Sequence, residues 1–584
     1  MIKLPHKTLV CLTLILLAGA AFRFYGLTIG FPFEYHVDEW FIVNRTLDMY
    51  RTANFKPPAF DYPSLLYYLL LAGAYVVGLF KETTLYDLYI FGRTLSALSG
   101  VATIAVVYLT GKRAYGVRAG LSAAALFACT VTALRESHYC TTDSINTLFI
   151  TLAVYFIVRV GMGDARRNYL FAGACIGLAA GSKYNGAFLS VPLILAHILR
   201  TRGESATTGD YSESPTGVEN DARTSRLRAV SGGLFSRWLL AAGLLCVLVF
   251  LSTTPYALLT PADFIKDVSK MSNALSRKVV EGNQHYIGTT AYWYYVENLL
   301  YWAMGPLPEA VCLLGVLYAL ARHRRQDLLL ACWLLIYFYI VGGWLNKAVR
   351  YTLPMLPFLS ILGAAMFVES FDYLRRTMRR KLALVVLALG LVTLSSAFLY
   401  ALAYMNIYAQ PHTGIQATRW ANANLPVGAR ILLEGPTPHE RPQVDGSLLI
   451  YQDPSFNFNA RRFDFQYLDV SKFSRTDADE NILRAELQQL LARADYIIMT
   501  TRWSEGLRHS PQASPVIREY YQTLLEGRSD FALVKQITVY PRLLGFDIND
   551  DAAELNFRIF DHPKVLIFQR QKPPTVSVSD KHSR

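Results

Sequence analysis

Residues 9–22, LVCLTLILLAGAAF, form an unbroken apolar run, and residues 34–44, EYHVDEWFIVN, follow it after a short spacer. The run lies within the stretch Thr8–Tyr25, which predicts a helix that crosses a membrane. Asp38 and Glu39 therefore lie at the mouth of a hydrophobic helix. A carboxylate is costly there unless it is neutralised, bound to a metal or used in function.

Similar apolar windows recur as far as Leu402 and then stop, in a chain of 584 residues that is 53% hydrophobic with a formal net charge of +13. A cleaved signal peptide is the alternative for the first run, but further spans follow it. Many basic residues lie in short loops between apolar runs, which is typical of membrane topology rather than of nucleic-acid binding. We expect a mainly α polytopic membrane protein with about 11 transmembrane helices plus a juxtamembrane helix, and no nucleic-acid partner.

The basic loops also predict the topology. Lys3 and Lys7 place the N-terminus inside, so the segment with Asp38 emerges outside. If Pro63–Phe80 only lies in the interface, the basic loop Gly111–Arg118 falls inside, and so does every later basic loop; if it spans, Gly111–Arg118 falls outside. We favour the first topology. The later basic loops are DARR (164–167), RHRR (322–325) and RRTMRRK (375–381).

This topology predicts a transmembrane domain over residues 1–403, with a catalytic external loop at 29–88. The segment 201–236 is rich in Ser, Thr, Gly and charge, which predicts a disordered cytoplasmic loop. Residues 404–584 should form an extracytoplasmic α/β domain that ends in a flexible tail. Helix and strand patterns alternate in ATRWANANLPVGARILLEG (417–435), ILRAELQQLLARADYIIMTT (482–501), SPVIREYYQTLLEG (514–527) and KVLIFQRQ (564–571).

The predicted extracytoplasmic domain contains no cysteine; all seven lie in or beside apolar segments. An external domain without disulfides favours a prokaryotic envelope protein over a eukaryotic secretory one. We therefore expect a multi-pass protein of the cell (plasma or inner) membrane.

Candidate functional side chains collect in the predicted external loops. Asp38 and Glu39 are adjacent, so on a helix they point about 100° apart and cannot both address one atom. We predict that one acts as a base and the other as an orienting or metal-side group. The stretch 261–282, PADFIKDVSKMSNALSRKVVEG, predicts an amphipathic surface helix, either a lid over the site or a solvated connector.

Asp61 lies in the same external loop, and further candidates lie in the other external segments: His138, Asp143, Lys183 and Arg350. Carboxylates and fixed cations on one face of a membrane suit a phosphate-bearing substrate and an activated hydroxyl. Structural alternatives stay open, because Asp143 is well placed as a helix N-cap and Arg350 could snorkel to the interface. His138 has no ligand spacing, so a structural role is open for it as well.

Four features together resemble the polytopic C-type glycosyltransferases, in particular the protein O-mannosyltransferase and lipid A aminoarabinose transferase superfamily, over residues 8–400. They are the DE pair at 38–39, the R-x-S-H-Y-x-T-T-D pattern at 135–143, GSKYN at 181–185 and KAVRYTLPMLPFLSILGA at 347–364. The resemblance implies a sugar donor on a polyprenyl phosphate, transfer with inversion, an outward-facing site and a protein, lipid or glycan acceptor.

The resemblance also implies roles for single residues. Asp38 is implied as the catalytic acid of the first loop, with Glu39 as its companion, and Asp143 as the acid of the second loop. Lys183 and Arg350 are implied near the donor phosphate. The chain departs from the pattern at FDYP (60–63), where Asp61 keeps an acid but Tyr62 replaces the cation. A divalent metal such as Mg or Mn, with Asp38 or Asp143 as a ligand, is one way to replace it.

Two other function classes compete with this prediction. A secondary transporter usually places ionisable residues at mid-span near broken helices in matching halves. Here they cluster at helix ends, and no internal repeat is visible. A membrane sensor with an external recognition domain leaves the acidic pair unexplained. A donor that carries its own phosphate leaving group needs no nucleotide site, and the sequence shows no Gly-rich phosphate loop.

Overall fold

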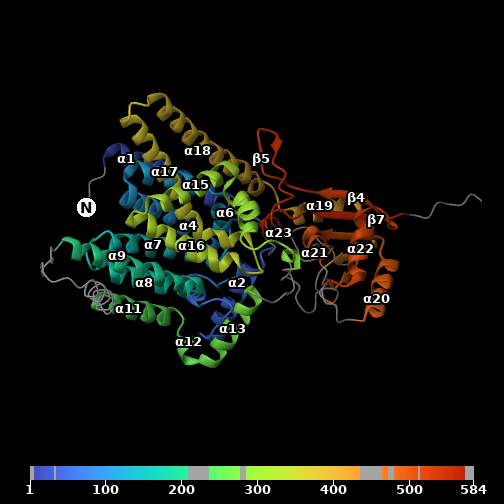
Figure 1. Cartoon of the computed structure of the whole chain (residues 1–584). Coiled ribbons are helices and arrows are strands. Elements are labelled where there is room, and N and C mark those ends of the chain that lie inside the picture. The colour runs from blue at the N-terminus through green and yellow to red at the C-terminus, as the bar shows by residue number, and fades with distance from the viewer. Residues whose placement is uncertain are drawn as a thin grey trace, which may run out of the picture.

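The chain folds into a bundle of long helices with a mixed sheet domain at one end (Figure 1). The computed structural model describes residues 5–31, 35–207, 236–276, 284–434, 463–470, 472, 479–508, 510 and 513–571. Most of the predicted disordered loop 201–236 and the predicted C-terminal tail lie outside the described residues. Both therefore stay predictions.

The described residues contain six helices long and apolar enough to cross a membrane, or up to eight if each of two bent helix pairs is one span. The six are His6–Phe24 (α1), Leu85–Tyr115 (α4), Thr142–Gly161 (α7), Arg325–Gly342 (α16), Val349–Arg376 (η5 with α17) and Arg380–Asn424 (α18 with α19). The bent pairs are Val117–Ala128 (α5) with Val131–His138 (α6 and η1), and Tyr295–Met304 with Pro306–Arg322 (α15). The prediction of a mainly α, multi-pass membrane protein is confirmed, while the number of about eleven spans stays a prediction.

The segment Pro63–Phe80 forms α3, Leu65–Gly78, a helix of 14 residues. At 1.5 Å per residue it is roughly 21 Å long, which is short of the roughly 30 Å hydrocarbon core. One face of α3, with Leu66 and Leu70, packs against Ile42 and Val43 of α2 (Val37–Thr52). Its length and packing support the predicted juxtamembrane helix.

The basic loops meet at the end of the bundle that lies away from the sheet domain. Ion pairs link them to each other and to α17 (Leu356–Arg376): Arg113 with Asp164 (2.5 Å), Arg118 with Asp372 (2.7 Å) and Arg324 with Glu369 (3.0 Å). Loops that share one end of a helical bundle face the same side of the membrane. The prediction that these basic loops share a side is confirmed.

The C-terminal region contains a five-stranded sheet in the order β2-β1-β3-β7-β4, in which β7 runs antiparallel to both of its neighbours. Its strands are Arg430–Glu434 (β1), Asp464–Leu468 (β2), Tyr496–Thr500 (β3), Phe531–Ile537 (β4) and Val565–Arg570 (β7). One face packs against α20 (Glu480–Arg493) and α22 (Pro515–Leu525), and the other against α19 (Thr413–Asn424). The predicted α/β domain is confirmed, with β2 and β4 as strands that the sequence patterns missed.

One part of this region leaves the sheet and enters the helical bundle. It centres on α23, Leu555–Arg558, where Phe557 is fully buried in the main core of the bundle. Leu555 and Phe560 pack with Tyr139, which follows the η1 turn. The predicted division at residues 403 and 404 falls within α18 (Arg380–Ala409), and we keep a two-domain division as a proposal.

Candidate active site

The first acid of the DE pair forms an ion pair at the surface of the bundle. Asp38 lies in the first turn of α2, where a carboxylate interacts favourably with the helix dipole. Its Oδ2 contacts Nη1 of Arg350, which lies at the start of η5, Val349–Met355. The two side chains are 18% and 17% exposed. The carboxylate is therefore held by a cation but is still accessible to a substrate.

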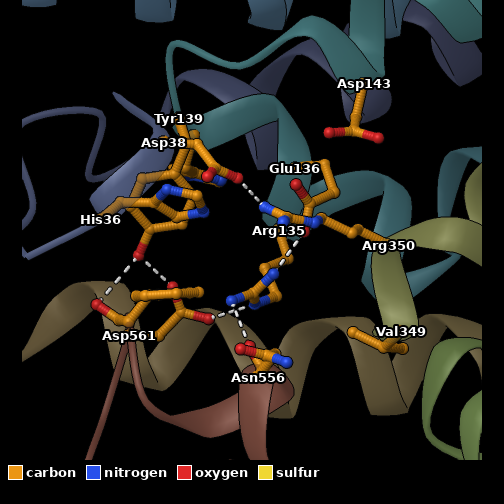
Figure 2. A network of polar contacts seen from close by, with 12 residues as sticks. His36, Asp38, Arg135, Glu136, Tyr139, Asp143, Val349, Arg350, Asn556 and Asp561 are labelled. Carbon is orange, nitrogen blue, oxygen red and sulfur yellow. Dashed lines mark hydrogen bonds and ion pairs between the residues drawn. The ribbon is translucent and has the colours of Figure 1, made fainter. Parts of the chain in front are cut away.

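A second acid and cation lie beside this pair. Asp143 lies in the first turn of α7, and its Oδ1 accepts a hydrogen bond from Nζ of Lys183 at 2.7 Å. Lys183 lies 5.1 Å from the ring centre of Tyr351, and the guanidinium of Arg350 lies 5.8 Å from that same ring centre. Figure 2 shows Asp38, Arg350 and Asp143 gathered around one region. The structure thus brings together four of the predicted site residues.

The FDYP stretch borders the same group. Tyr184, next to Lys183, donates a hydrogen bond to the backbone oxygen of Phe60 at 2.9 Å. Asp61 pairs with Arg45 of α2, Nη1 to Oδ2, at 3.5 Å. Burial, and then the charge of Asp38, raise the pKa of Tyr62 well above its ordinary value, so Tyr62 is a neutral hydroxyl. Arg45 supplies a cation close to the position where the sequence lacks one.

Sequence reasoning missed Arg45, although a signal for it was present. Arg45 follows Asp38 by seven residues, which is two turns of a helix and therefore the same face of α2.

The predicted surface helix forms over Pro261–Ser276 (α13), and it packs on the loop that carries Asp61. Residues 277–282 of the prediction lie outside the described residues. Asp267 accepts a hydrogen bond from the backbone N–H of Phe60 at 3.0 Å, and Asp263 pairs with Lys56 at 2.8 Å. The rings of Phe264 and Phe60 meet edge to face, 5.5 Å apart. α13 therefore covers this edge of the group, while its action as a lid stays a prediction.

The second acid of the DE pair points away from this group. Glu39 is fully buried, and Arg93 of α4 donates to both of its carboxylate oxygens at 2.7 Å. The backbone N–H of Cys140 donates to Oε1 at 2.8 Å. This placement fits the orienting role that was predicted for one of the two acids, and it leaves Asp38 as the one able to take a proton.

His138 is not brought into the group. Its two ring nitrogens each lie 2.9 Å from a backbone oxygen, those of Leu134 and Tyr25, and the ring stacks on Tyr408 at 3.9 Å. Both polar atoms of the side chain are thus engaged inside the bundle. We leave His138 out of the proposed substrate-binding set, in keeping with the structural alternative.

The candidate metal ligands contact cations instead. Asp38 contacts Arg350, and Asp143 contacts Lys183. Within the described part of the chain, no three side chains of His, Cys, Asp or Glu are grouped so that they could hold a metal ion. Mg and Mn need several oxygen ligands with surplus negative charge. The residues present do not fit such a site, so we derive no step through a metal.

A sealed polar network lies directly beside the group, and sequence reasoning missed most of it (Figure 2). Arg135, fully buried, contacts Glu136 and donates from Nε to Oδ2 of Asp561 at 2.7 Å. Tyr139 also donates to Asp561. Asp561 lies 426 residues from Arg135, and a contact at that separation leaves no local pattern in the sequence.

Comparisons with known proteins agree with this architecture. Residues 63–209 match the family model of dolichyl-phosphate-mannose-protein mannosyltransferase. No protein of curated function matches the chain in sequence.

Among solved structures, the chain is similar to the apo oligosaccharyltransferase of Archaeoglobus fulgidus, with a TM-score of 0.52 and 13% identity over 88% of this chain and 72% of that one. It is also similar to the AglB oligosaccharyltransferase of that organism in complex with an inhibitory peptide and a dolichol-phosphate (TM-score 0.51, 12% identity, 88% and 72% covered). ArnT from Cupriavidus metallidurans bound to undecaprenyl phosphate is similar with a TM-score of 0.49 and 14% identity over 97% of this chain and 98% of that one.

The fold is therefore that of the polytopic C-type glycosyltransferases, and the resemblance seen in the sequence is confirmed. Within this class, the segment that contains Arg93, Asp143 and Lys183 matches the mannosyltransferase family model.

Proposed function

We propose that the chain is an integral membrane glycosyltransferase that moves a sugar, a hexosyl or pentosyl group, from a polyprenyl-phosphate donor to an acceptor hydroxyl with inversion. One observation carries the proposal. An accessible carboxylate, Asp38, lies beside two cations, Arg350 and Lys183, around the ring of Tyr351. This is the pairing of base and phosphate binder that the reaction needs.

The reaction is a single displacement. Asp38 accepts the proton of the acceptor hydroxyl while the hydroxyl oxygen forms a bond to the anomeric carbon on one face of the sugar. The bond from that carbon to the phosphate oxygen breaks on the opposite face, so the anomeric centre inverts. The electron pair leaves with the polyprenyl phosphate, whose added charge Lys183 and Arg350 stabilise. Glu39 and Arg93 act by holding the start of α2 in place.

The test uses purified protein in lipid nanodiscs with a panel of radiolabelled undecaprenyl-phosphate sugars and extracted envelope glycans, lipids and peptides as acceptors. We expect release of undecaprenyl phosphate with at least one donor and a product of inverted anomeric configuration by NMR. The Asp38→Asn variant should release it about 10²- to 10⁴-fold more slowly. Failure of every donor, or equal release by the variant, refutes the proposal.

We further propose that the site and the C-terminal domain face the outside of the cell membrane. Glu82, before α4, is exposed, and Ala165 in the opposite, basic loop is exposed as well. A membrane-impermeant maleimide applied to intact cells should label Glu82→Cys and not Ala165→Cys. The reverse pattern would place the site inside.

A further inference from the structure

The segment 550–562 carries three buried carboxylates, and two of them, Glu554 and Asp561, bond to the helical bundle next to the candidate active site (Asp561 in Figure 2). Glu554 is 2% exposed and Asp561 is 1% exposed. Both belong to the C-terminal region, yet most of their partners lie in the bundle. A buried charge is costly, and it is kept only where its partners are well placed.

Asp561 fastens the turn that leads to Asp143. Its Oδ2 accepts from Nε of Arg135 at 2.7 Å and from the hydroxyl of Tyr404 at 2.8 Å, and its Oδ1 accepts from the hydroxyl of Tyr139. Burial alone would raise the pKa of Asp561, but the charges of Arg135 and His562 and the hydrogen bonds from Tyr139 and Tyr404 together hold the pKa below its ordinary value. Arg135 and Tyr139 flank the η1 turn (Glu136–His138), and Asp143 follows four residues later.

The neighbour of Asp561 reaches the helix of the proposed base. The ring of Phe560 lies 4.2 Å from the ring of His36, which also packs on Tyr139 at 4.6 Å. His36 is the N-cap of α2, where its Nδ1 accepts from the backbone N–H of Glu39 at 3.5 Å. Phe560 therefore packs against the N-cap of α2, and the first turn of this helix carries Asp38.

Glu554 fixes the backbone next to Arg350. Its Oε2 accepts from the backbone N–H of Val349 at 3.1 Å, and its Oε1 accepts from the hydroxyl of Tyr286 at 2.5 Å. Val349 is the residue before Arg350, and it begins the η5 turn. A carboxylate bound to that N–H fixes where the turn starts and hence where Arg350 points.

We propose that Asp561 and Glu554 are positioning residues, through which the C-terminal segment sets the mutual placement of Asp38, Asp143 and Arg350. This inference rests on the proposed transferase function and assigns a role to the C-terminal region. Three of the contacted residues, Tyr139, His36 and Val349, lie within four residues of a site residue. A misplacement of about 1 Å at a reacting centre can lower a rate about 100-fold. The contacts of Asp561 and Glu554 therefore affect catalysis as well as stability.

The competing explanation is that the segment only adds apolar packing to the bundle. Phe557 and Leu555 provide such packing. A purely structural role predicts variants with less folded protein but normal turnover for each folded molecule. A positioning role predicts normal donor binding and slow turnover.

The experiment compares Asp561→Asn and Glu554→Gln with Asp551→Asn in the full-length protein in nanodiscs. Asp551 is a matched control, since it lies in the same segment with a side chain 39% exposed and pairs with Lys564 at 2.7 Å. For each variant, kcat, KM for the undecaprenyl-phosphate sugar and the fraction of folded protein are measured. Tyr139→Phe is a milder variant that removes one hydrogen bond to Asp561 and leaves no unpaired buried charge.

We expect kcat per folded molecule to fall roughly 10- to 100-fold in Asp561→Asn and Glu554→Gln, and roughly 3- to 10-fold in Tyr139→Phe, with KM within about threefold. Asp551→Asn should keep the wild-type values. Unchanged kcat per folded molecule in Tyr139→Phe and in whichever of the two acid variants folds would overturn the proposal.

A second readout separates this proposal from the function on which it rests. Amide hydrogen exchange should rise at residues 136–143 in Asp561→Asn and at 349–352 in Glu554→Gln, but not in Asp551→Asn. If the wild type is inactive with every donor, the transferase function fails, and the exchange pattern alone decides whether these acids position the turns. Exchange equal to that of the control would then refute the positioning role.

Discussion

Asp38 and Glu39 are neighbours in the chain, yet their ion pairs lie in two different regions. The pair of Asp38 with Arg350 is partly open to solvent, whereas Glu39 and Arg93 are 0% and 2% exposed. A fully exposed pair contributes about 0–1 kcal/mol to stability and breaking a sealed pair costs about 3–5 kcal/mol, so the partly open pair lies between these two limits. The open pair can exchange partners with a substrate at little cost, and the sealed pair cannot. Accessibility, rather than the DE motif itself, therefore distinguishes the acid proposed for catalysis from the acid that supports the fold.

The largest expected effect comes from the open pair. Asp38→Asn should lower the transfer rate about 10²- to 10⁴-fold, because a positioned base is lost. The melting temperature should stay close to that of the wild type, because the lost pair is partly exposed. Single-turnover transfer and thermal unfolding check both expectations. Asp48→Asn, an exposed acid on the same helix, serves as the control. Retention of more than about a tenth of the rate would remove Asp38 from this role.

The sealed pair should behave in the opposite way. Glu39→Gln leaves Arg93 buried without its charge partner, and we expect the free energy of unfolding to fall by about 3–5 kcal/mol. Breaking the exposed pair of Lys81 with Asp87, 2.6 Å apart at the start of α4, by Lys81→Gln should cost about 0–1 kcal/mol. Thermal and denaturant unfolding in detergent measure the difference. Equal losses in the two variants would mean that burial does not distinguish the pairs.

Lys183→Gln probes the second cation of the open region. It removes one charge-assisted contact to the leaving phosphate, which corresponds to about 1.5–3 kcal/mol and hence a 10- to 100-fold lower kcat/KM for the lipid donor. Lys266→Gln, at an exposed lysine on α13, is the control. Steady-state kinetics with a varied donor concentration provide the measurement. An unchanged kcat/KM would leave Lys183 as a structural partner of Asp143 only.

A smaller effect concerns His36, whose pKa lies well below its ordinary value because of burial first and the charges of Arg350 and Arg135 next. Below about pH 6.5 the unfolded chain binds a proton at this side chain and the folded chain does not. Stability should therefore fall with acidification, by at most about 1.4 kcal/mol per pH unit from this group.

His36→Asn keeps an N-capping oxygen but does not titrate. Its melting temperature should therefore decline less than that of the wild type between about pH 7 and pH 5. His323→Asn, at an exposed histidine, should follow the wild type. Parallel declines in all three proteins would contradict the assignment of acid sensitivity to His36.

The smallest expected effect is that of metal removal. Because Arg350 and Lys183 already neutralise Asp38 and Asp143, chelation by EDTA should change the transfer rate by less than about twofold. Inductively coupled plasma mass spectrometry of the dialysed protein serves as the control for metal content. Loss of activity that Mg or Mn restores would show that the acids exchange their cation partners for a metal during the reaction.

Local patterns made much of this architecture predictable. Adjacency placed Asp38 and Glu39 on different faces of α2, and alternating patterns gave α19, α20, α22 and β7. The side on which the basic loops fall indicated an interfacial helix at 63–80. Pairings across the fold could not be read in this way. Neither Arg93 nor Asp561 has a sequence neighbour that reveals its partner, because the partners meet only when distant helices pack.

The separation of Arg135 from Asp561 in the sequence has a consequence for the synthesis of the protein. Translation at about 5–20 residues per second needs roughly 20–90 s to cover the 426 residues between them. During that interval the bundle can insert, but the turn before Asp143 lacks its last fastener. A nascent or truncated chain that ends before Glu554 would therefore hold all the proposed catalytic side chains and still be incompletely assembled. Full activity would therefore begin only after the C-terminal segment has been synthesised.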